Sequence, residues 1–368
     1  MRSRTGTKGE LGQSTPDRGL ERPRSASRGQ AAVAHPGRRG SARFAGALRL
    51  WSGLNVLLVV SCASPASAQQ YPSHAIRLIV PYAPGGGADS VARIVTKQVS
   101  GTIGQPIVIE NKGGAGSIIG TDIVAKAEAD GYTLLFGQSG PISINPAVYK
   151  SLRYDPVKDF APITMTTSYP YILTVNAKLP VKTLQDFIAY AKNQQGAMNY
   201  GSTGIGSANH LVSELFDRRA GVTMTHIPYR GTALAVADLL SGQVGMVFGD
   251  PISVLAHMDA GTLRGLGVTS RQRSPVAPDL PTIAESGFPD FDAIAWHGVF
   301  APARTPPAII KRLHAEFVKA LADPATKSLL VKQAMQTVGN TPEEFAAFIR
   351  QDIEFWKGIA TQANISVN

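Results

Sequence analysis

The stretch that most constrains the fold is IRLIVPYAPGGGADSVARIVTKQV, residues 76–99. It begins with a run of β-branched and other apolar residues, which is typical of a strand buried on both faces. Three glycines follow at 85–87, and apolar residues then recur at helical spacing. The helix after such a turn presents unpaired backbone N–H groups at its partly positive end, and glycine lets an anion approach them closely. We therefore predict that this loop forms one side of an anion-binding cleft.

The same succession of strand, turn and helix recurs along the chain. Further strands are predicted at 106–110, 132–136, 198–200, 222–229, 244–248 and 263–269. Strands that alternate with helices at this spacing favour parallel βαβ units and an α/β fold. The Pro/Asn-rich stretch at 141–146 is expected to form a loop.

The length of 368 residues favours two α/β lobes over a single core. Two extended stretches, FAPITMTTSYPYILTV at 160–175 and FDAIAWHGVFA at 291–301, would carry the chain from one lobe to the other and back. We therefore expect three divisions of the chain. They are a leader at 1–68, a first lobe at 69–171 and 293–368, and a second lobe at 172–292.

A second strand–glycine–helix junction, YGSTGIGSANH, occupies residues 200–210. It supplies hydroxyl groups from Ser202 and Ser207, and its glycines, including Gly206, allow main-chain N–H groups to converge on an anion. His210 lies one turn into the helix, where a histidine is more often a structural hydrogen-bonding group than a ligand contact. This junction is the predicted second side of the cleft.

Several other residues have two interpretations. Asp89 is either a helix cap or a ligand contact. Gly114-x-Gly116 after a strand superficially resembles a dinucleotide-binding turn, but its spacing differs by one and a structural turn is favoured. Asp250, just beyond a predicted strand, is a general base, a hydrogen-bond acceptor for a ligand amine or hydroxyl, or a helix cap. Trp296 is a core residue or a cleft wall.

Charge and motif content argue against several classes of function. Residues 1–68 hold 11 basic and 3 acidic residues, which leaves 25 basic and 23 acidic residues in the rest of the chain, so the body has no electrostatic footprint for nucleic acid. Ser139 is not in a Gly-x-Ser-x-Gly elbow, and the seven histidines never fall at i,i+4. The sequence therefore predicts no catalytic residue, metal or cofactor.

The sequence of the leader predicts an export signal. An apolar stretch at 50–60 has the length of a signal h-region and is too short for a comfortable membrane span. The small residues at 66–68 predict cleavage after Ala68, and a lipoprotein signal at Cys62, the one cysteine in the chain, is the alternative. No other segment is long and apolar enough to cross a membrane, so we expect a periplasmic protein that is soluble unless it is lipidated.

Several motifs together resemble one known family. The stretches IRLIVPYAPGGGADSVAR, VIENKGGAGSIIG, YGSTGIGSANHL, HIPYRG and DLPTIAESG…AWHGVFAPARTP follow one another in the order found in periplasmic receptors of tripartite tricarboxylate transporters, also called Bug-type receptors. The resemblance covers residues 71–368. It implies a two-lobed solute-binding fold of the type II, Venus flytrap kind, with two crossing strands, that binds a small carboxylate as a monomer and delivers it to a large and a small membrane subunit.

The resemblance also implies which residues hold the ligand carboxylate, largely through backbone N–H groups and ordered waters. Ser139 would line the floor of the cleft. The residues on its two sides would be Tyr82, Pro84, Gly86 and Asp89, and Ser202, Gly206, Ser207 and His210. One departure concerns the strand that typically ends Phe-Asp-Asn and here reads Phe248-Gly249-Asp250, because it shifts the acid by one position and puts the ligand preference of amino-acid-binding relatives in doubt.

Two functions from different classes remain open on the sequence. The first is a periplasmic carboxylate receptor without catalytic activity. The second is an exported α/β enzyme, a hydrolase or dehydrogenase, acting on a small carboxylate. The sequence contains neither a nucleophile–base set nor a nicotinamide fingerprint, which favours the receptor.

Overall fold

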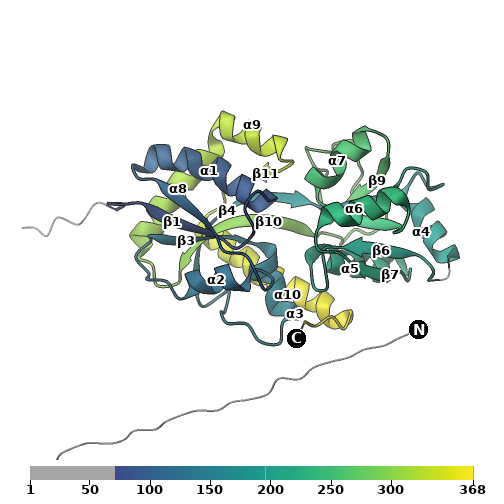
Figure 1. Ribbon diagram of the computed structural model, residues 1–368, viewed down its shortest axis with the longest axis horizontal. Coiled ribbons are helices and arrows are strands. Elements are labelled where there is room, and N and C mark those ends of the chain that lie inside the picture. Colours follow the sequence, from purple (N-terminus) through teal and green to yellow (C-terminus); the bar gives the residue numbers. More distant parts are fainter. Residues whose placement is uncertain (1–70, 195, 368) are drawn as a thin grey trace, which may run out of the picture. The chain divides into compact units, whose positions relative to one another are not determined.

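The computed structural model describes residues 71–194 and 196–367. The predicted leader and export signal at 1–68, with Cys62 and the cleavage point after Ala68, lie outside the described residues. The described residues form two sheets, each flanked by helices (Figure 1). Both sheets belong to one compact unit of the chain.

The first sheet has six strands in the order β11-β4-β10-β3-β1-β2. Its strands are β1 (Ile76–Val80), β2 (Ile107–Asn111), β3 (Thr133–Gln138), β4 (Phe160–Pro170), β10 (Ile294–Pro302) and β11 (Gln336–Thr337). β1 pairs in parallel with β2 and with β3, so that Leu78 lies opposite Ile109 on one side and Leu134 on the other. β10 runs antiparallel to both β3 and β4.

Helices cover both faces of the first sheet because its central strands are apolar on both sides. These helices are α1 (Gly87–Ile103), α2 (Ile118–Ala125), α3 (Asn145–Val148), α8 (Pro307–Ala322), α9 (Pro324–Lys332) and α10 (Pro342–Gln362). Leu78 packs in one core with Val91 and Val95 of α1, whereas its neighbour Ile79 packs in a separate core with Phe345 of α10. Each of these side chains is fully buried. The strand and the helix predicted within residues 76–99 are therefore both present in the structure.

The second sheet has five strands in the order β7-β6-β8-β5-β9. Its elements are β5 (Ile172–Asn176), α4 (Leu184–Asn193), β6 (Asn199–Ser202), α5 (Ala208–Ala220), β7 (Thr225–Pro228), α6 (Thr232–Ser241), β8 (Met246–Gly249), α7 (Pro251–Asp259) and β9 (Leu263–Val268). β6 pairs in parallel with β7 and β8, and β5 runs antiparallel to β8 and β9. α4 begins with a capping box between Thr183 and Asp186.

Two connections join the sheets. β4 ends at Pro170 in the first sheet and β5 begins at Ile172 in the second, so Tyr171 lies at the first connection. The chain returns to the first sheet as β10 at Ile294. These are the two extended stretches that the sequence predicted to pass between sheets.

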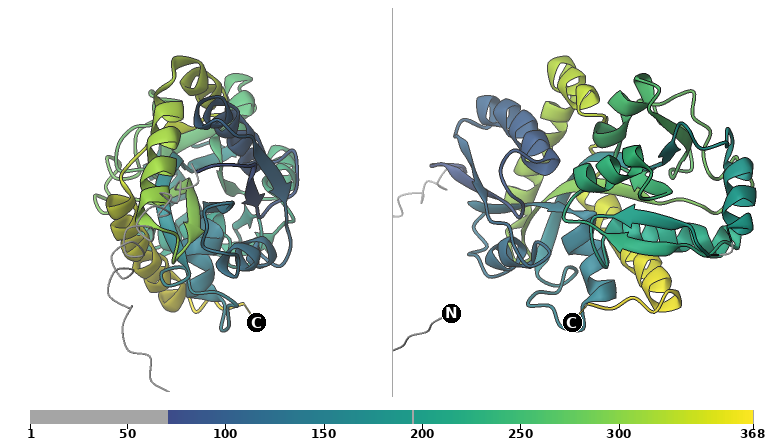
Figure 2. Two further views of the ribbon diagram at one scale, coloured as in Figure 1. Left: turned by 90° about the vertical axis from the view of Figure 1, so that its left-hand side faces the viewer. Right: turned by 45° about the vertical axis from the view of Figure 1, so that its right-hand side comes forward.

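The C-terminal helix α10 contacts both halves of the structure. Its first half packs on the first sheet through Phe345, and its second half places Trp356 and Ile359 in the same core as Leu211 and Leu215 of α5. In Figure 1 the yellow α10 lies below the junction of the two halves, and Figure 2 shows it from two further sides. The predicted assignment of 293–368 to one lobe did not anticipate this shared packing.

The predicted loop at 141–146 is helical in the structure. Gly140–Ile144 forms a turn of π-helix, η1, that continues directly into α3. Both short helices carry proline in their first turn, where the missing N–H costs no hydrogen bond. Proline at this position therefore marks a helix start here rather than a loop.

Candidate functional site

A cavity of about 450 Å³ lies between the two sheets. On the side of the first sheet its walls include Tyr82, Gly116, Ser117, Gln138, Ser139, Gly140, Pro141, Ile144, Asn145, Tyr149, Tyr169 and Trp296, with Tyr171 at the connection. On the side of the second sheet they include Thr203, Ile205, Gly206, Ser207, Ala208, Asn209, Thr232 and Asp250. A cavity of this size suits a small organic ligand that both sides contact.

Helix N-termini from both sheets open onto this cavity. The residues preceding α2, η1 and α5 are Ser117, Ser139 and Ser207, and all three line it. Thr232, the first residue of α6, also lines it. None of these four helices has a side-chain hydrogen bond at its N-cap. The first N–H group of α2, that of Ile118, donates to the Ala115 carbonyl oxygen at 3.1 Å. The first N–H groups of η1, α5 and α6 have no side-chain partner at the N-cap and are available to an anion.

The loop at 203–207, which we call the ligand loop, shows why the α5 N-terminus is uncapped. The Ser207 hydroxyl, which would normally accept from the helix, donates instead, and it lies 2.6 Å from the Gly204 carbonyl oxygen and 2.8 Å from Asn209 Oδ1. Asn209 Oδ1 also accepts from the backbone N–H and the hydroxyl of Thr203. These bonds order the loop and leave the first N–H groups of α5 unpaired by side chains.

The cavity contains no lysine, arginine or histidine among its described lining residues, and Asp250 is its one carboxyl group. Burial raises the pKa of Tyr82, Tyr169 and Tyr171, so all three phenols are neutral. Any anion held here is bound by neutral donors rather than by an ion pair. A helix N-terminus stabilises an anion by about 0.3–1 kcal/mol at an exposed site and up to ~2 kcal/mol when partly buried, so several together can replace a cationic side chain.

Asp250 is the N-cap of α7. Its Oδ1 accepts from the Ser253 N–H at 3.0 Å and from the Ser253 hydroxyl at 2.6 Å. Its Oδ2 accepts from the Thr232 hydroxyl at 2.9 Å. The carboxylate thus caps a helix, one of the interpretations that the sequence left open, and it lines the cavity.

The structure brings five of the ten sequence-predicted site residues to the cavity: Tyr82, Ser139, Gly206, Ser207 and Asp250. The other five, Pro84, Gly86, Asp89, Ser202 and His210, are absent from its walls. Of the two glycines predicted to donate N–H groups to one anion, Gly206 is on the cavity wall and Gly86 is not. The Gly206 N–H already donates to His210 Nδ1 at 3.0 Å.

The first glycine turn is satisfied by the protein's own carboxylate. Asp89 Oδ2 accepts from the Gly85 N–H and from Arg93 Nε, each at 2.9 Å, and Asp89 Oδ1 accepts from Asn111 Nδ2 at 3.0 Å. The Arg93 guanidinium, helped by these bonds, lowers the pKa of the buried Asp89 carboxyl. Asp89 therefore holds the turn through the Gly85 N–H, while α1, like the four helices at the cavity, has no side-chain hydrogen bond at its N-cap.

The sequence reasoning missed the turn that does reach the cavity. Gly116 and Ser117 line it at the start of α2, and both adopt positive φ, 62° and 70°. A Cβ on Gly116 would lie 2.6 Å from the Tyr149 hydroxyl, so only glycine allows Tyr149 to approach. The pattern GGAGS after β2 resembles the composition of the turn after β1, and that likeness was the available signal.

Further lining residues had no usable sequence signal. Nothing in the sequence distinguishes three of these, Tyr149, Tyr169 and Tyr171, from ordinary aromatic residues at a helix end or in an extended segment. Trp296 is 1% exposed, yet it lines the cavity, and its indole N–H donates to the buried Asp352 at 2.8 Å. Trp296 therefore belongs both to the core and to the cleft wall, the two interpretations that the sequence left open.

In the part of the chain that the structure describes, no helix combines the length and apolarity needed to cross a membrane. Nor do the described residues hold a group of three or more histidine, cysteine, aspartate or glutamate side chains that could bind a metal ion.

Comparison with known proteins places the chain in a family. Residues 91–365 match the family described as "Tripartite tricarboxylate transporter family receptor". The chain belongs to this family. The receptor is 38% identical over 301 residues to BugT of Bordetella pertussis, which covers 82% of this chain and 92% of BugT. The family binds solutes and is not enzymatic, so the predicted family and the absence of an enzymatic role are confirmed.

Solved structures of relatives share the fold of the receptor. A protein of R. palustris solved with adipate is 33% identical, with a TM-score of 0.72 over 80% of this chain and 99% of that one. MatC from Rhodopseudomonas palustris with bound malate is 32% identical, with a TM-score of 0.69 over 78% of this chain and 99% of that one. The predicted α/β periplasmic binding-protein fold is confirmed.

Proposed function

We propose that the receptor captures a small carboxylate between two lobes in the periplasm and delivers it to the large and small membrane subunits of a tripartite transporter. The observation that carries the proposal is the group of uncapped helix N-termini, from both sheets, that opens onto one cavity without a cationic side chain. Adipate and malate, found with relatives, are ligands of this chemistry.

The ligand carboxylate is assigned to the N-termini of α2, η1 and α5. Ser139 contributes a hydroxyl group there and Tyr82 a neutral phenol. Gly206 and Ser207 belong to the ligand loop, whose own bonds hold the α5 N-terminus at the cavity. Asp250 faces the rest of the ligand, and its charge favours a ligand with a hydroxyl or amine at that end over one with a second carboxylate. Ser202 and His210 bond to Gly204 and Gly206 of the ligand loop from behind, and Pro84, Gly86 and Asp89 belong to the first glycine turn.

Lobe closure is the proposed mechanism of signalling. The lobes, 69–171 with 293–368 and 172–292, close on the ligand, and the membrane subunits recognise the closed form. A ligand shifts this equilibrium only through contacts that exist in the closed state, so it must touch both sides of the cavity. Export through the predicted signal, with cleavage after Ala68 or lipidation at Cys62, would bring the receptor to the periplasm.

Isothermal titration calorimetry with mono-, di- and tricarboxylates and amino acids tests the proposal, with chromatography of each mixture to detect product. Binding of a carboxylate without turnover is the expected result. Ser207→Trp places a bulky ring at the α5 N-terminus and should abolish binding while the thermal unfolding temperature is kept. Ser241→Trp, at an exposed position near the end of α6, is the matched control. Unchanged affinity in Ser207→Trp would remove the site assignment, and product formation would remove the receptor function.

A further inference from the structure

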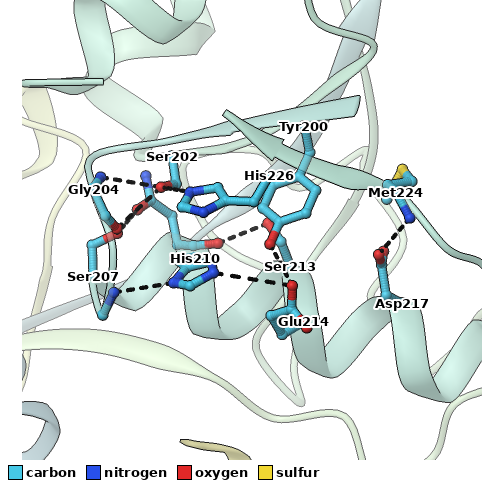
Figure 3. Close-up of polar contacts among 12 residues, drawn as sticks. Tyr200, Ser202, Gly204, Ser207, His210, Ser213, Glu214, Asp217, Met224 and His226 are labelled. Carbon is cyan, nitrogen blue, oxygen red and sulfur yellow. Dashed lines mark hydrogen bonds and ion pairs between the residues drawn. The ribbon is translucent and has the colours of Figure 1, made fainter. Parts of the chain in front are cut away.

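Two stacked histidines lie directly behind the ligand loop. His210 on α5 is 5% exposed, and its ring lies 3.8 Å from that of His226 on β7, with 13° between the ring planes. His226 Nε2 lies 2.5 Å from Ser202 Oγ, and Ser202 Oγ accepts from the Gly204 N–H at 3.1 Å. Figure 3 shows the two rings between the ligand loop and the outer side chains of α5.

The bond between His210 and Gly206 fixes the tautomer of His210. The Gly206 N–H donates to Nδ1, so Nδ1 is unprotonated and the ring proton is on Nε2. Nε2 lies 4.0 Å from Glu214 Oε1, which itself accepts from the Tyr200 hydroxyl at 2.6 Å. Both ring nitrogens and the face toward His226 therefore have a defined neighbour.

We propose that neutral His210, in its Nε2–H tautomer, is a positioning residue that holds the ligand loop in the conformation that binds the carboxylate. The proposal rests on the proposed function only in assigning this loop to the ligand. His210 itself does not touch the cavity. The proposal gives His210 this positioning role in place of the ligand contact that the family resemblance implied.

The loop needs such a constraint because two of its five residues are glycines with positive φ. Gly204 has a φ of 126° and Gly206 a φ of 75°, conformations that glycine adopts easily and also leaves easily. The two imidazoles hold both glycines: His226 acts on Gly204 through Ser202, and His210 acts on Gly206 directly. The N–H groups at the start of α5, which follow the loop at once, are thereby kept directed at the cavity.

The surroundings of His210 keep it neutral. The titratable side chains that face it are His226 of β7, Tyr200 of β6 and Glu214 of α5, with Asp217 one turn further along α5. Protonation of His210 would place an N–H on Nδ1 opposite the Gly206 N–H and remove that bond. Burial lowers the pKa of His210 and of His226 to about 4, so both rings are neutral near pH 7.

Two substitutions of His210 test whether the loop needs a hydrogen-bond acceptor at the position of Nδ1 or the imidazole ring itself. The side-chain oxygen of asparagine reaches the position of Nδ1, whereas glutamine places its amide near Nε2. We expect His210→Asn to bind adipate within about threefold of the unmodified receptor, and His210→Gln to bind about tenfold or more weakly, because it leaves a buried N–H without an acceptor. His257→Gln on α7, away from the cavity, is the control and should change nothing.

Nuclear magnetic resonance gives a readout that does not depend on the ligand. Long-range ¹H–¹⁵N spectra of the receptor should show the Nε2–H tautomer for His210 at pH 7, and the Gly206 amide should exchange at least about tenfold faster in His210→Gln than in His210→Asn. An Nδ1–H tautomer would overturn the proposal. So would equal affinity losses in both variants with unchanged Gly206 exchange. If the unmodified receptor binds no carboxylate, the proposed function fails, and the tautomer and exchange data still decide the role of His210.

Discussion

Acid should destabilise the receptor through His297, which lies in the middle of β10. Its side chain is 1% exposed, stacks on Phe136 with ring centroids 5.5 Å apart, and places Nδ1 2.8 Å from the Thr167 hydroxyl. Burial lowers the pKa of His297 from 6.5 to about 3. The unfolded chain therefore binds a proton at mildly acidic pH that the folded protein excludes.

The sign and size follow from the two pKa values. A histidine whose pKa is lowered by folding contributes its full stability above pH 6.5 and loses it progressively as the pH falls toward 3. Integrating the proton uptake of the unfolded chain between pH 7 and pH 5 gives a loss of about 2 kcal/mol in the free energy of unfolding from this one residue.

Urea denaturation at pH 7 and pH 5, of the unmodified receptor and of His297→Phe, measures this term. Phenylalanine keeps the ring and cannot titrate, and the other titrating groups are common to both proteins. We expect the free energy of unfolding to fall between pH 7 and pH 5 by about 2 kcal/mol more in the unmodified receptor than in the variant. An equal fall in the two proteins would refute the reasoning that burial in β10 keeps His297 neutral.

Three further predictions use the same structure. Asp250→Asn removes the one carboxylate among the described cavity walls and should raise the affinity for adipate relative to hexanoate, measured by calorimetry; a larger gain for hexanoate would contradict the assigned role. Gly120→Ala should lower the free energy of unfolding by about 1–3 kcal/mol, because its Cβ would lie 2.5 Å from the Lys112 carbonyl oxygen. Gly101→Ala, in open space on α1, should instead raise the free energy of unfolding by up to about 1 kcal/mol. Urea denaturation of the two variants compares them. Asp89→Asn should cost about 1–3 kcal/mol by the same measurement, because the buried side chain loses its charge-assisted bonds. No loss would show that these bonds do not stabilise the first glycine turn.

Much of the fold could be read from local patterns. The alternation of apolar strands with amphipathic helices predicted the α/β fold, and Thr341 and Glu344, three residues apart in the chain, form the capping box that starts α10. These features depend on neighbours within four residues, which the sequence places next to each other. The helical turn at 140–148 was missed because prolines favour both loops and the first turn of a helix.

The candidate site was predicted only in part, and the two glycine turns of the first sheet explain why. Both follow a parallel strand and both precede a helix, so their local sequences support the same prediction. In the first, Asp89 bends back to the Gly85 N–H, and the turn is not part of the cavity wall. In the second, Gly116 and Ser117 turn with positive φ and open onto the cavity.

The sequence by itself determined most of the strands and helices, the turn at 140–148 excepted, and that N–H groups would collect where glycine turns lead into helices. Only the tertiary structure decided which of those turns faces the other sheet, and which amides the protein already uses. The order of strands in a sheet and the pairing of Gly206 with His210 depend on contacts between segments that the chain brings together in space. The free energy of those contacts comes from burial, which a one-dimensional pattern of residues does not specify.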